Sequence, residues 1–268
     1  MPAMGRALPG SAWLGAGDRV CAKCPVRHFR RTLKRYKRFD PKTRGAGHRA
    51  VFCMQPFRLP AVLPALATAS ETEASPRLLV VLFDGFELLD VFGPVELLLL
   101  AGFNVTYAAE PAGVVRGGVA RAPTCTSLEA PLSLSEVAGV SWDLLLLPGG
   151  QGTRALVSEA PWLAALRSAC NAAHSVCSVC TGSALLAAAG MLAGCKATSN
   201  KRAFEWVVSS SALASEVEWQ PKARWVADRS GGKLMASSSG VAAGMDMAVW
   251  LASELLGARV GEAAARRA

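Results

Sequence analysis

The amino-acid sequence predicts an α/β fold in which a parallel β-sheet is sandwiched between helices. Residues 78–83 form a continuous apolar run, and residues 143–147 are apolar after Asp143; both have the length of strands that are buried on both faces of such a sheet. Each run is followed by a glycine-containing turn and then by a helical stretch, an alternation typical of parallel sheets. Because ligands of this architecture lie beyond the carboxyl ends of the strands, the residues that follow each strand are the candidates for a site.

Four elements are expected in the first half of the regular region, and each has a local signal. They are a strand at 78–83, an apolar helix at about 90–101, a strand at 103–109 and a hairpin at 114–120. A turn at Asp84-Gly85 ends the first strand, and Gly93-Pro94 suits the first helical turn, where a proline needs no N–H partner. Gly117-Gly118 indicates the hairpin.

Seven further elements are expected after residue 140. They are strands at 143–147 and 174–179, a largely helical stretch at 153–173, a helix directly after Cys180, a short helix at about 202–208, a hairpin at 224–237 and a closing apolar helix at 240–256. Pro148-Gly149-Gly150 stops the first of these strands, Pro161 restarts the helical stretch, and Gly231-Gly232 turns the hairpin. Asp90, Gly149-Gly150 and Cys180 all follow strand ends, so three separate segments converge on one rim of the sheet.

Charge divides the chain into an N-terminal extension at 1–70, a folded domain at 77–258 and a short C-terminal tail at 259–268. The whole chain carries a net charge of +9, but residues 1–70 hold fourteen Lys or Arg and two Asp, which leaves −3 for the remainder. The extension has no sustained periodicity, so we expect it to be largely disordered and to act as a transit peptide, for a plastid before a mitochondrion. The alternative is a solvated basic tail that contacts RNA or a membrane surface, and the alternative location is the cytoplasm.

The composition also bears on partners and on metals. The folded domain is not basic, so nothing assigns nucleic-acid binding to it, and no stretch reaches the eighteen or more apolar residues of a membrane-spanning helix. Eight irregularly spaced cysteines do not form a disulfide framework, so reduced thiols are expected. Cys21 and Cys24 with His28 resemble half of a zinc site, but His48 and Cys53 lie at unhelpful spacing for the other half, and no metal site is predicted.

Cys180, at the junction of a strand and a helix, is the strongest candidate for a functional residue. A strand that ends there and passes straight into a helix exposes the sulfur, while the first helical N–H groups and the helix dipole favour a thiolate. The small residues Thr181-Gly182-Ser183 would let a substrate approach closely. The alternative, a small buried hydrophobic residue, suits Cys125, Cys170 and Cys195 better.

The partner of Cys180 is neither a second thiol nor an imidazole. Cys177 lies three strand steps away, about 10 Å, which exceeds the roughly 7 Å that a disulfide spans. His174, the only histidine after residue 70, lies about 20 Å away along the extended strand. Asp90 is the best remaining candidate, although it is equally an ordinary helix N-cap. Beside a thiolate it would have to keep its proton in order to donate it.

Gly149 and Gly150 are candidates for binding a negatively charged intermediate. Two glycines after a strand leave backbone N–H groups open toward the rim, where they could hold a developing anion. The alternative is that Pro148-Gly149-Gly150 is only a turn.

Four motifs in this order resemble the ThiJ/PfpI superfamily, which includes the parkinsonism-associated protein deglycase. They are Phe86-Glu-Leu-Leu-Asp90-Val-Phe-Gly-Pro94, Leu147-Pro-Gly-Gly150, Ser178-Val-Cys-Thr-Gly-Ser183 and Gly240-Val-Ala-Ala-Gly-Met-Asp246. The resemblance implies a flavodoxin-like fold of the class I glutamine amidotransferase type. It places the family's nucleophile on Cys180, its acid on Asp90 and its adjacent hydroxyl on Thr181. The isonitrile hydratases and the sensor domains of AraC-type regulators are the branch most similar to this chain.

Three departures from the superfamily's patterns narrow the function that the resemblance implies. Thr181 stands where the protease-like members have His, and Asp90 where the deglycases generally have Glu. Ser199-Asn200-Lys201 replaces a Thr-His pair that the hydratase and sensor branch often carries. We therefore expect a cysteine-dependent hydro-lyase resembling isonitrile hydratase, acting on a small molecule without a metal or organic cofactor, as a homodimer. The alternatives are glyoxalase or deglycase chemistry on reactive carbonyls, or a non-catalytic redox- or ligand-sensing domain.

Overall fold

The structure is a computed structural model, and it describes residues 75–118 and 126–268 of the chain. The basic segment 1–70, with Cys21, Cys24 and His28, lies outside the described residues, as does Cys125. None of the helices in the described part is long and apolar enough to cross a membrane.

A seven-stranded sheet forms the centre of the domain and confirms the predicted α/β fold. Its strand order is β10-β11-β7-β6-β1-β2-β5. All neighbours pair in parallel except β10 and β11, which form the expected late hairpin. The strands are β1 Arg77–Leu82, β2 Asn104–Ala109, β5 Leu132–Ser133, β6 Trp142–Leu147, β7 Ala173–Val179, β10 Trp225–Asp228 and β11 Leu234–Ser238.

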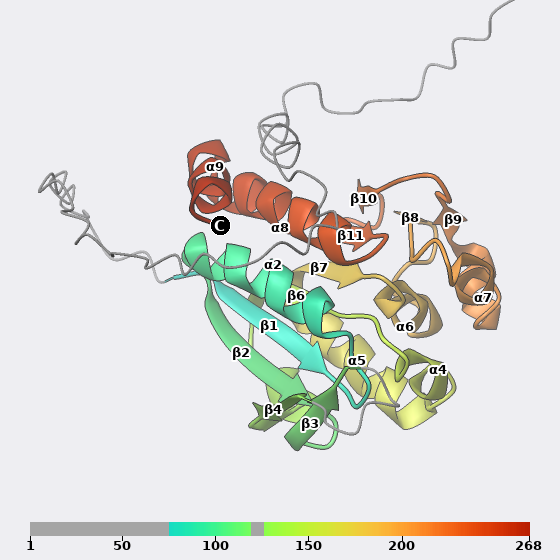
Figure 1. Cartoon of the computed structure of the whole chain (residues 1–268). Coiled ribbons are helices and arrows are strands. Elements are labelled where there is room, and N and C mark those ends of the chain that lie inside the picture. The colour runs from blue at the N-terminus through green and yellow to red at the C-terminus, as the bar shows by residue number, and fades with distance from the viewer. Residues whose placement is uncertain (1–74, 119–125) are drawn as a thin grey trace, which may run out of the picture. The chain divides into compact units, whose positions relative to one another are not determined.

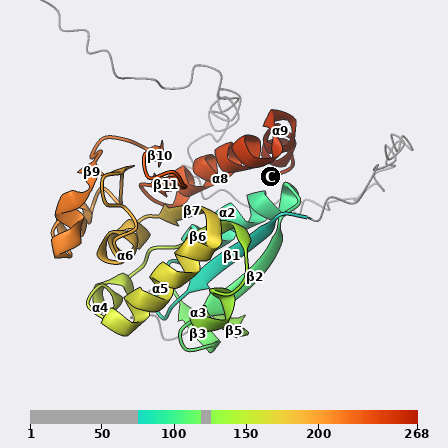
Figure 2. The ribbon, with the colours of Figure 1, turned by 180° about the vertical axis from the view of Figure 1, so that it is seen from behind.

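Helices cover both faces of this sheet, which agrees with the long apolar runs of the central strands β1 and β6. On one face lie α2 (Leu88–Leu100), α8 (Val241–Leu256) and α9 (Ala258–Arg267), as Figure 1 shows. On the other face lie α3 (Leu134–Val137) and α5 (Ala160–Ala172), seen in Figure 2. Five consecutive residues of β1, 78–82, are fully buried between these layers.

Glycine at position 244 lets α8 lie directly on the end of β7 that leads to Cys180. A Cβ atom at Gly244 would come within 2.9 Å of Val179 Cγ1 and 3.5 Å of Pro94 Cγ in α2. Close packing of α2, α8 and β7 therefore depends on the absence of a side chain there.

Two of the expected segments differ from the sequence-based prediction. The expected C-terminal tail is the helix α9, which begins after Gly257, a residue with φ of 96° that ends α8 and turns the chain. The expected hairpin at 114–120 is wider, because β3 (Gly113–Gly117) pairs antiparallel with β4 (Thr126–Ala130) beyond the expected range.

The segment between residues 181 and 220 contains short elements that position the site. They are α6 (Gly182–Ala188), β8 (Lys196–Ala197), α7 (Phe204–Val208), a 3-10 helix (Ala212–Glu216) and β9 (Glu218–Trp219). A further short helix, α4 (Thr153–Leu156), follows β6.

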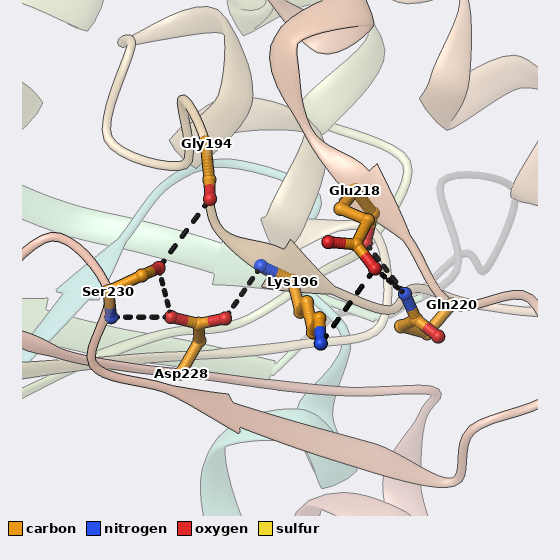
Figure 3. A network of polar contacts seen from close by, with 6 residues as sticks. All are labelled: Gly194, Lys196, Glu218, Gln220, Asp228 and Ser230. Atoms are coloured by element: carbon orange, nitrogen blue, oxygen red, sulfur yellow. Dashed lines mark hydrogen bonds and ion pairs between the residues drawn. The ribbon is translucent and has the colours of Figure 1, made fainter. Parts of the chain in front are cut away.

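Asp228 at the end of β10 ties the small β8–β9 sheet to the central sheet (Figure 3). Its carboxylate accepts hydrogen bonds from Lys196 N at 2.9 Å and from Ser230 N at 2.6 Å, and it also contacts the Ser230 hydroxyl. Lys196 Nζ in turn lies 3.9 Å from a carboxylate oxygen of Glu218. These contacts fix the start of the segment that continues into Ser199 and Asn200.

Candidate active site

Cys180 occupies a strained turn at the end of β7. Its φ of 58° makes it the one non-glycine residue of the described chain with a positive φ. Hydrogen bonds hold this conformation: Cys180 N donates to Ser238 O at 2.9 Å, and Cys180 O accepts from the hydroxyls of Ser199 at 2.9 Å and Ser183 at 3.3 Å. Strain that is held this firmly is characteristic of a nucleophile elbow, in which a side chain is presented at the strand end.

Asp90, in the first turn of α2, is fully buried and interacts with the side chain of Cys180. Its Oδ2 accepts a hydrogen bond from Gly149 N at 3.1 Å, while Oδ1 has no hydrogen-bond partner. Burial, with a smaller contribution from Glu87, raises the pKa of this carboxyl to about 7, although the Gly149 N–H opposes the shift. The carboxyl can therefore hold a proton near neutral pH, and the N–H on Oδ2 leaves Oδ1 as the oxygen that carries it.

The Cys180 sulfur differs from the expectation of a thiolate. Burial, followed by the neighbouring Asp90 carboxyl, raises the pKa of this thiol to about 12. The Thr181 N–H and the Asn200 amide act in the opposite direction, as the position before a helix suggests, but they are outweighed. The sulfur is therefore a thiol at rest.

Gly149 and Gly150 lie against the elbow, but their N–H groups are already engaged. Gly149 N donates to Asp90, and Gly150 N donates to Thr181 Oγ1 at 3.0 Å, so neither is open toward the rim as expected. A Cβ atom on Gly149 would lie 2.6 Å from Thr181 N and 2.8 Å from Cys180 Cβ. These glycines allow the loop after β6 to reach both Asp90 and the elbow.

Thr181 is buried, and its hydroxyl is occupied within the loop. Thr181 Oγ1 accepts from Gly150 N and lies 3.2 Å from Thr153 Oγ1, which donates to Gly150 O at 2.7 Å. In this arrangement the hydroxyl joins the loop after β6 to the elbow.

Asn200 contacts the sulfur directly, and the sequence alone assigned it no role. Its Nδ2 donates to Cys180 Sγ at 3.0 Å. The neighbouring Ser199 binds the carbonyl of the same cysteine. Both residues follow β8, a two-residue strand that has no periodic signal in the sequence, so their approach to Cys180 could not be read from spacing. The only sequence signal for a role of Asn200 was that Ser199-Asn200-Lys201 replaces the Thr-His pair of the similar branch.

The remaining candidate partners lie elsewhere. His174 lies near the start of β7, at the opposite end of the strand from Cys180, and its Nδ1 is 3.8 Å from an Asp143 oxygen. Cys177 is a free, buried thiol within β7. The structure agrees with the prediction that neither residue partners Cys180.

A substrate can reach the sulfur because Cys180 is partly exposed to solvent. Two surface hollows of the described part, one lined by Leu156 and Trp162 and the other by Val105 and Tyr107, include neither Cys180 nor Asp90. No cluster of three or more metal-binding side chains occurs within residues 75–118 and 126–268.

Known proteins share this fold and parts of this sequence. The chain is 36% identical over 115 residues to an isonitrile hydratase of Pseudomonas putida, a match that covers 43% of this chain and 46% of that protein, so less than half of the relative is matched. It is 27% identical over 160 residues to the deglycase TK1284 of Thermococcus kodakarensis, covering 60% of this chain and 93% of that one. The structure of Drosophila melanogaster DJ-1beta superposes with a TM-score of 0.60 at 22% identity, covering 72% of this chain and 97% of that one.

The family comparison covers most of the described domain. The model of the DJ-1/PfpI family matches residues 76–254, from the start of β1 almost to the end of α8. That stretch contains all four sequence motifs and every residue of the candidate site. The chain therefore belongs to the DJ-1/PfpI family.

Proposed function

We propose that this protein is a cysteine-dependent enzyme that hydrates isonitriles, converting R–NC and water into an N-substituted formamide. The observation that carries the proposal is a strained Cys180 next to an Asp90 carboxyl that can keep its proton, with Oδ1 unpartnered. A protonated carboxyl suits a substrate whose reacting carbon must gain both a nucleophile and a proton. The similarity to the isonitrile hydratase of Pseudomonas putida supports the same reaction.

In the first step the Cys180 sulfur attacks the terminal carbon of the isonitrile, and the Oδ1 proton of Asp90 moves to the same carbon. An S–C bond and a C–H bond form, and the carbon–nitrogen bond becomes the C=N bond of a thioimidate. The thiol proton passes to Oδ1, which restores the carboxyl. A thiol at rest is compatible with this step, because its proton leaves as the sulfur attacks.

In the second step water adds to the thioimidate. The water oxygen bonds to the carbon and one of its protons goes to nitrogen, through Asp90, which gives a tetrahedral intermediate. The C–S bond then breaks, the hydroxyl proton returns to sulfur, and the formamide leaves. Gly149, Gly150 and Thr181 hold Asp90 and the elbow in place, and the Thr181 N–H next to the sulfur is the backbone donor best placed to stabilise charge.

Turnover of cyclohexyl isocyanide by the purified protein tests this proposal. We expect formamide production in the native protein and its loss in Cys180→Ala, measured by liquid chromatography. Cys195→Ala, which removes a buried thiol of the same domain, is the matched control and should keep activity. Turnover that survives in Cys180→Ala, or its absence from the native protein, would contradict the proposal.

Glyoxalase or deglycase chemistry is the second candidate, because the similarity to deglycase TK1284 covers 60% of this chain. The same thiol would attack the carbonyl carbon of methylglyoxal. Assaying methylglyoxal consumption with the same three proteins distinguishes the two activities by which substrate depends on Cys180. Redox sensing is less favoured, since a thiol with a pKa of about 12 supplies little thiolate to react with peroxide.

The proposal extends to location and assembly. The basic N-terminal segment supports import into a plastid, where the domain would act as a homodimer on a small-molecule substrate.

A further inference from the structure

We propose that Asn200 is a further catalytic residue, whose side-chain amide donates a hydrogen bond to the Cys180 sulfur and stabilises negative charge there. The role of Asn200 in turnover rests on the proposed function, whereas its interaction with the sulfur does not. Charge develops on sulfur twice in the reaction, when the thiol proton leaves and when the C–S bond breaks. A fixed donor at that atom serves both steps.

The contact itself is short and direct. Asn200 Nδ2 lies 3.0 Å from Cys180 Sγ, and Asn200 is only partly exposed. The donor acts on the pKa of the thiol in the direction opposite to burial and to Asp90. A hydrogen bond to an ionised group is stronger than one to a neutral group, so its effect grows as the sulfur becomes negative.

The other end of the same side chain fixes which atom faces the sulfur. Asn200 Oδ1 accepts hydrogen bonds from Arg202 N at 3.0 Å and from Ala203 N at 3.2 Å. Rotating the amide by half a turn would place its NH₂ group against two N–H donors and lose both bonds. The two backbone donors therefore hold the oxygen, and the NH₂ group must point at the sulfur.

The adjacent residues Ser199 and Asn200 each donate a hydrogen bond to Cys180, at different atoms. Ser199 Oγ donates to the Cys180 carbonyl, and Asn200 Nδ2 donates to its sulfur. The segment that carries them begins at Lys196, whose N–H is bound by Asp228 in the network of Figure 3. The donor is therefore anchored to the central sheet, as a preorganised group must be.

The chemistry of an amide defines what Asn200 can do. Unlike an imidazole, it neither takes nor releases a proton at neutral pH. It can stabilise charge on the sulfur but cannot act as a base. Proton transfer is left to Asp90, the buried carboxyl that also interacts with the thiol.

The experiment measures the alkylation of Cys180 by iodoacetamide between pH 6 and 10 in the full chain, with the modified cysteine identified by mass spectrometry. Asn200→Ser and Asn200→Asp are compared with the native protein. Both replacements keep an oxygen that can accept from the backbone N–H groups, but neither presents a donor at the sulfur. We expect Cys180 in both to react about ten-fold more slowly at each pH, because the thiolate loses a charged hydrogen bond.

Asn171→Ala, an exposed amide at the end of α5, is the matched control and should react within two-fold of the native rate. A role limited to capping the turn at 200–203 predicts native alkylation in Asn200→Ser, and that result would overturn the proposal. Slowing in Asn200→Asp alone would also overturn it, because added charge would then be the cause.

Alkylation requires no isonitrile, so the two proposals fail separately. If cyclohexyl isocyanide is turned over, kcat/KM should fall in Asn200→Ser by a factor similar to that of alkylation. If nothing is turned over but alkylation slows as expected, the proposed reaction fails while the assignment of Asn200 as donor to the sulfur stands.

Discussion

Burial is the main cause that raises the pKa of both Asp90 and Cys180. The Asp90 carboxyl makes ionisation of the thiol harder still, whereas the hydrogen bond with Cys180 lowers the pKa of Asp90 slightly. The pair behaves as one unit that holds two protons at slightly acidic pH and loses the first near pH 7. The proton that is lost first is the one that the proposed mechanism uses.

We predict that kcat/KM for isonitrile hydration is highest below pH 7 and falls about tenfold for each further pH unit. The Oδ1 proton of Asp90, whose pKa is about 7, must be present when the sulfur attacks. Asp90→Asn should lose about 100-fold or more in kcat/KM and show no break near pH 7. Steady-state kinetics from pH 5 to 9 measure both effects. A native profile that rises through pH 7 would instead make Asp90 a base and contradict the mechanism.

The same carboxyl makes the stability of the fold depend on pH. Below pH 4 Asp90 is protonated in both the folded and the unfolded state. Between pH 4 and about 7 only the unfolded state loses the proton. The free energy of unfolding therefore falls as the pH rises through this window. The loss is on the order of 4 kcal/mol. Urea unfolding should therefore show Asp90→Asn gaining stability relative to the native protein between pH 4 and pH 8.

Glu96→Gln is the control for that measurement, because it makes the same change of carboxyl to amide at an exposed position of the same helix. Its stability relative to the native protein should change little over this range. If the two variants show the same change of stability with pH, burial does not raise the pKa of Asp90 and the prediction is wrong.

Part of the site could be predicted from residues alone, and part could not. Asp90, Gly149 and Cys180 each follow a strand of a parallel sheet, so their convergence followed from topology. The protonation state of the sulfur could not be predicted, because it depends on the burial of Cys180 and on Asp90 and Asn200, which are distant from it in the sequence. Asn200 was missed because a hydrogen bond across 20 residues leaves no trace in local spacing.

At the scale of elements, the position of the elbow depends on how closely α8 packs on β7. Gly244 is the point of contact, and a Cβ atom there would meet Val179, the residue before Cys180, at 2.9 Å. Gly244→Ala should therefore destabilise the fold by about 1–3 kcal/mol, because the helix or the strand must shift. It should also lower the rate of Cys180 alkylation or turnover, since the shift occurs next to the elbow.

Gly139→Ala is the matched control, because a Cβ atom at Gly139 meets nothing within 4 Å and its backbone is not in the positive-φ region. Urea unfolding of the two variants compares a packed glycine with an open one. If the two variants have the same free energy of unfolding, α8 can move away from β7 without destabilising the fold.

The long apolar elements of the fold were the predictable ones. The strands β1, β6 and β7 and the helices α2, α5 and α8 carry clear apolar runs or helical periodicity bounded by glycine or proline. The two-residue strands β8 and β9 are too short to show a period of two, and they form only because tertiary contacts such as those of Asp228 hold them. The helix α9 is rich in alanine and arginine, and its composition resembles that of a tail.

At the scale of the whole molecule, the helix that carries Asp90 on its buried side exposes an apolar stripe on the other. Leu89, Phe92 and Leu99 of α2 are 54%, 38% and 48% exposed. With 3.6 residues per turn, these three positions fall within an arc of about 80°. The exposed Glu96 lies within the same arc, between Phe92 and Leu99, so one charged side chain interrupts the stripe. Exposed apolar side chains on a surface helix suit contact with another protein surface, and the second subunit of the proposed homodimer would supply that surface beside the site.

We therefore predict that the α2 stripe forms the dimer contact. Leu89→Gln combined with Phe92→Gln should halve the mass measured by light scattering after size-exclusion chromatography at about 20 μM, because burying a polar amide removes the apolar gain of the interface. Leu213→Gln, which alters an exposed leucine of the 3-10 helix, is the matched control and should leave the mass unchanged. A native protein that elutes as a monomer would refute the dimer, and a double variant that stays dimeric would move the contact away from α2. Because the substituted side chains point away from Asp90, a monomer that keeps Cys180 alkylation would also show that each site is complete within one chain.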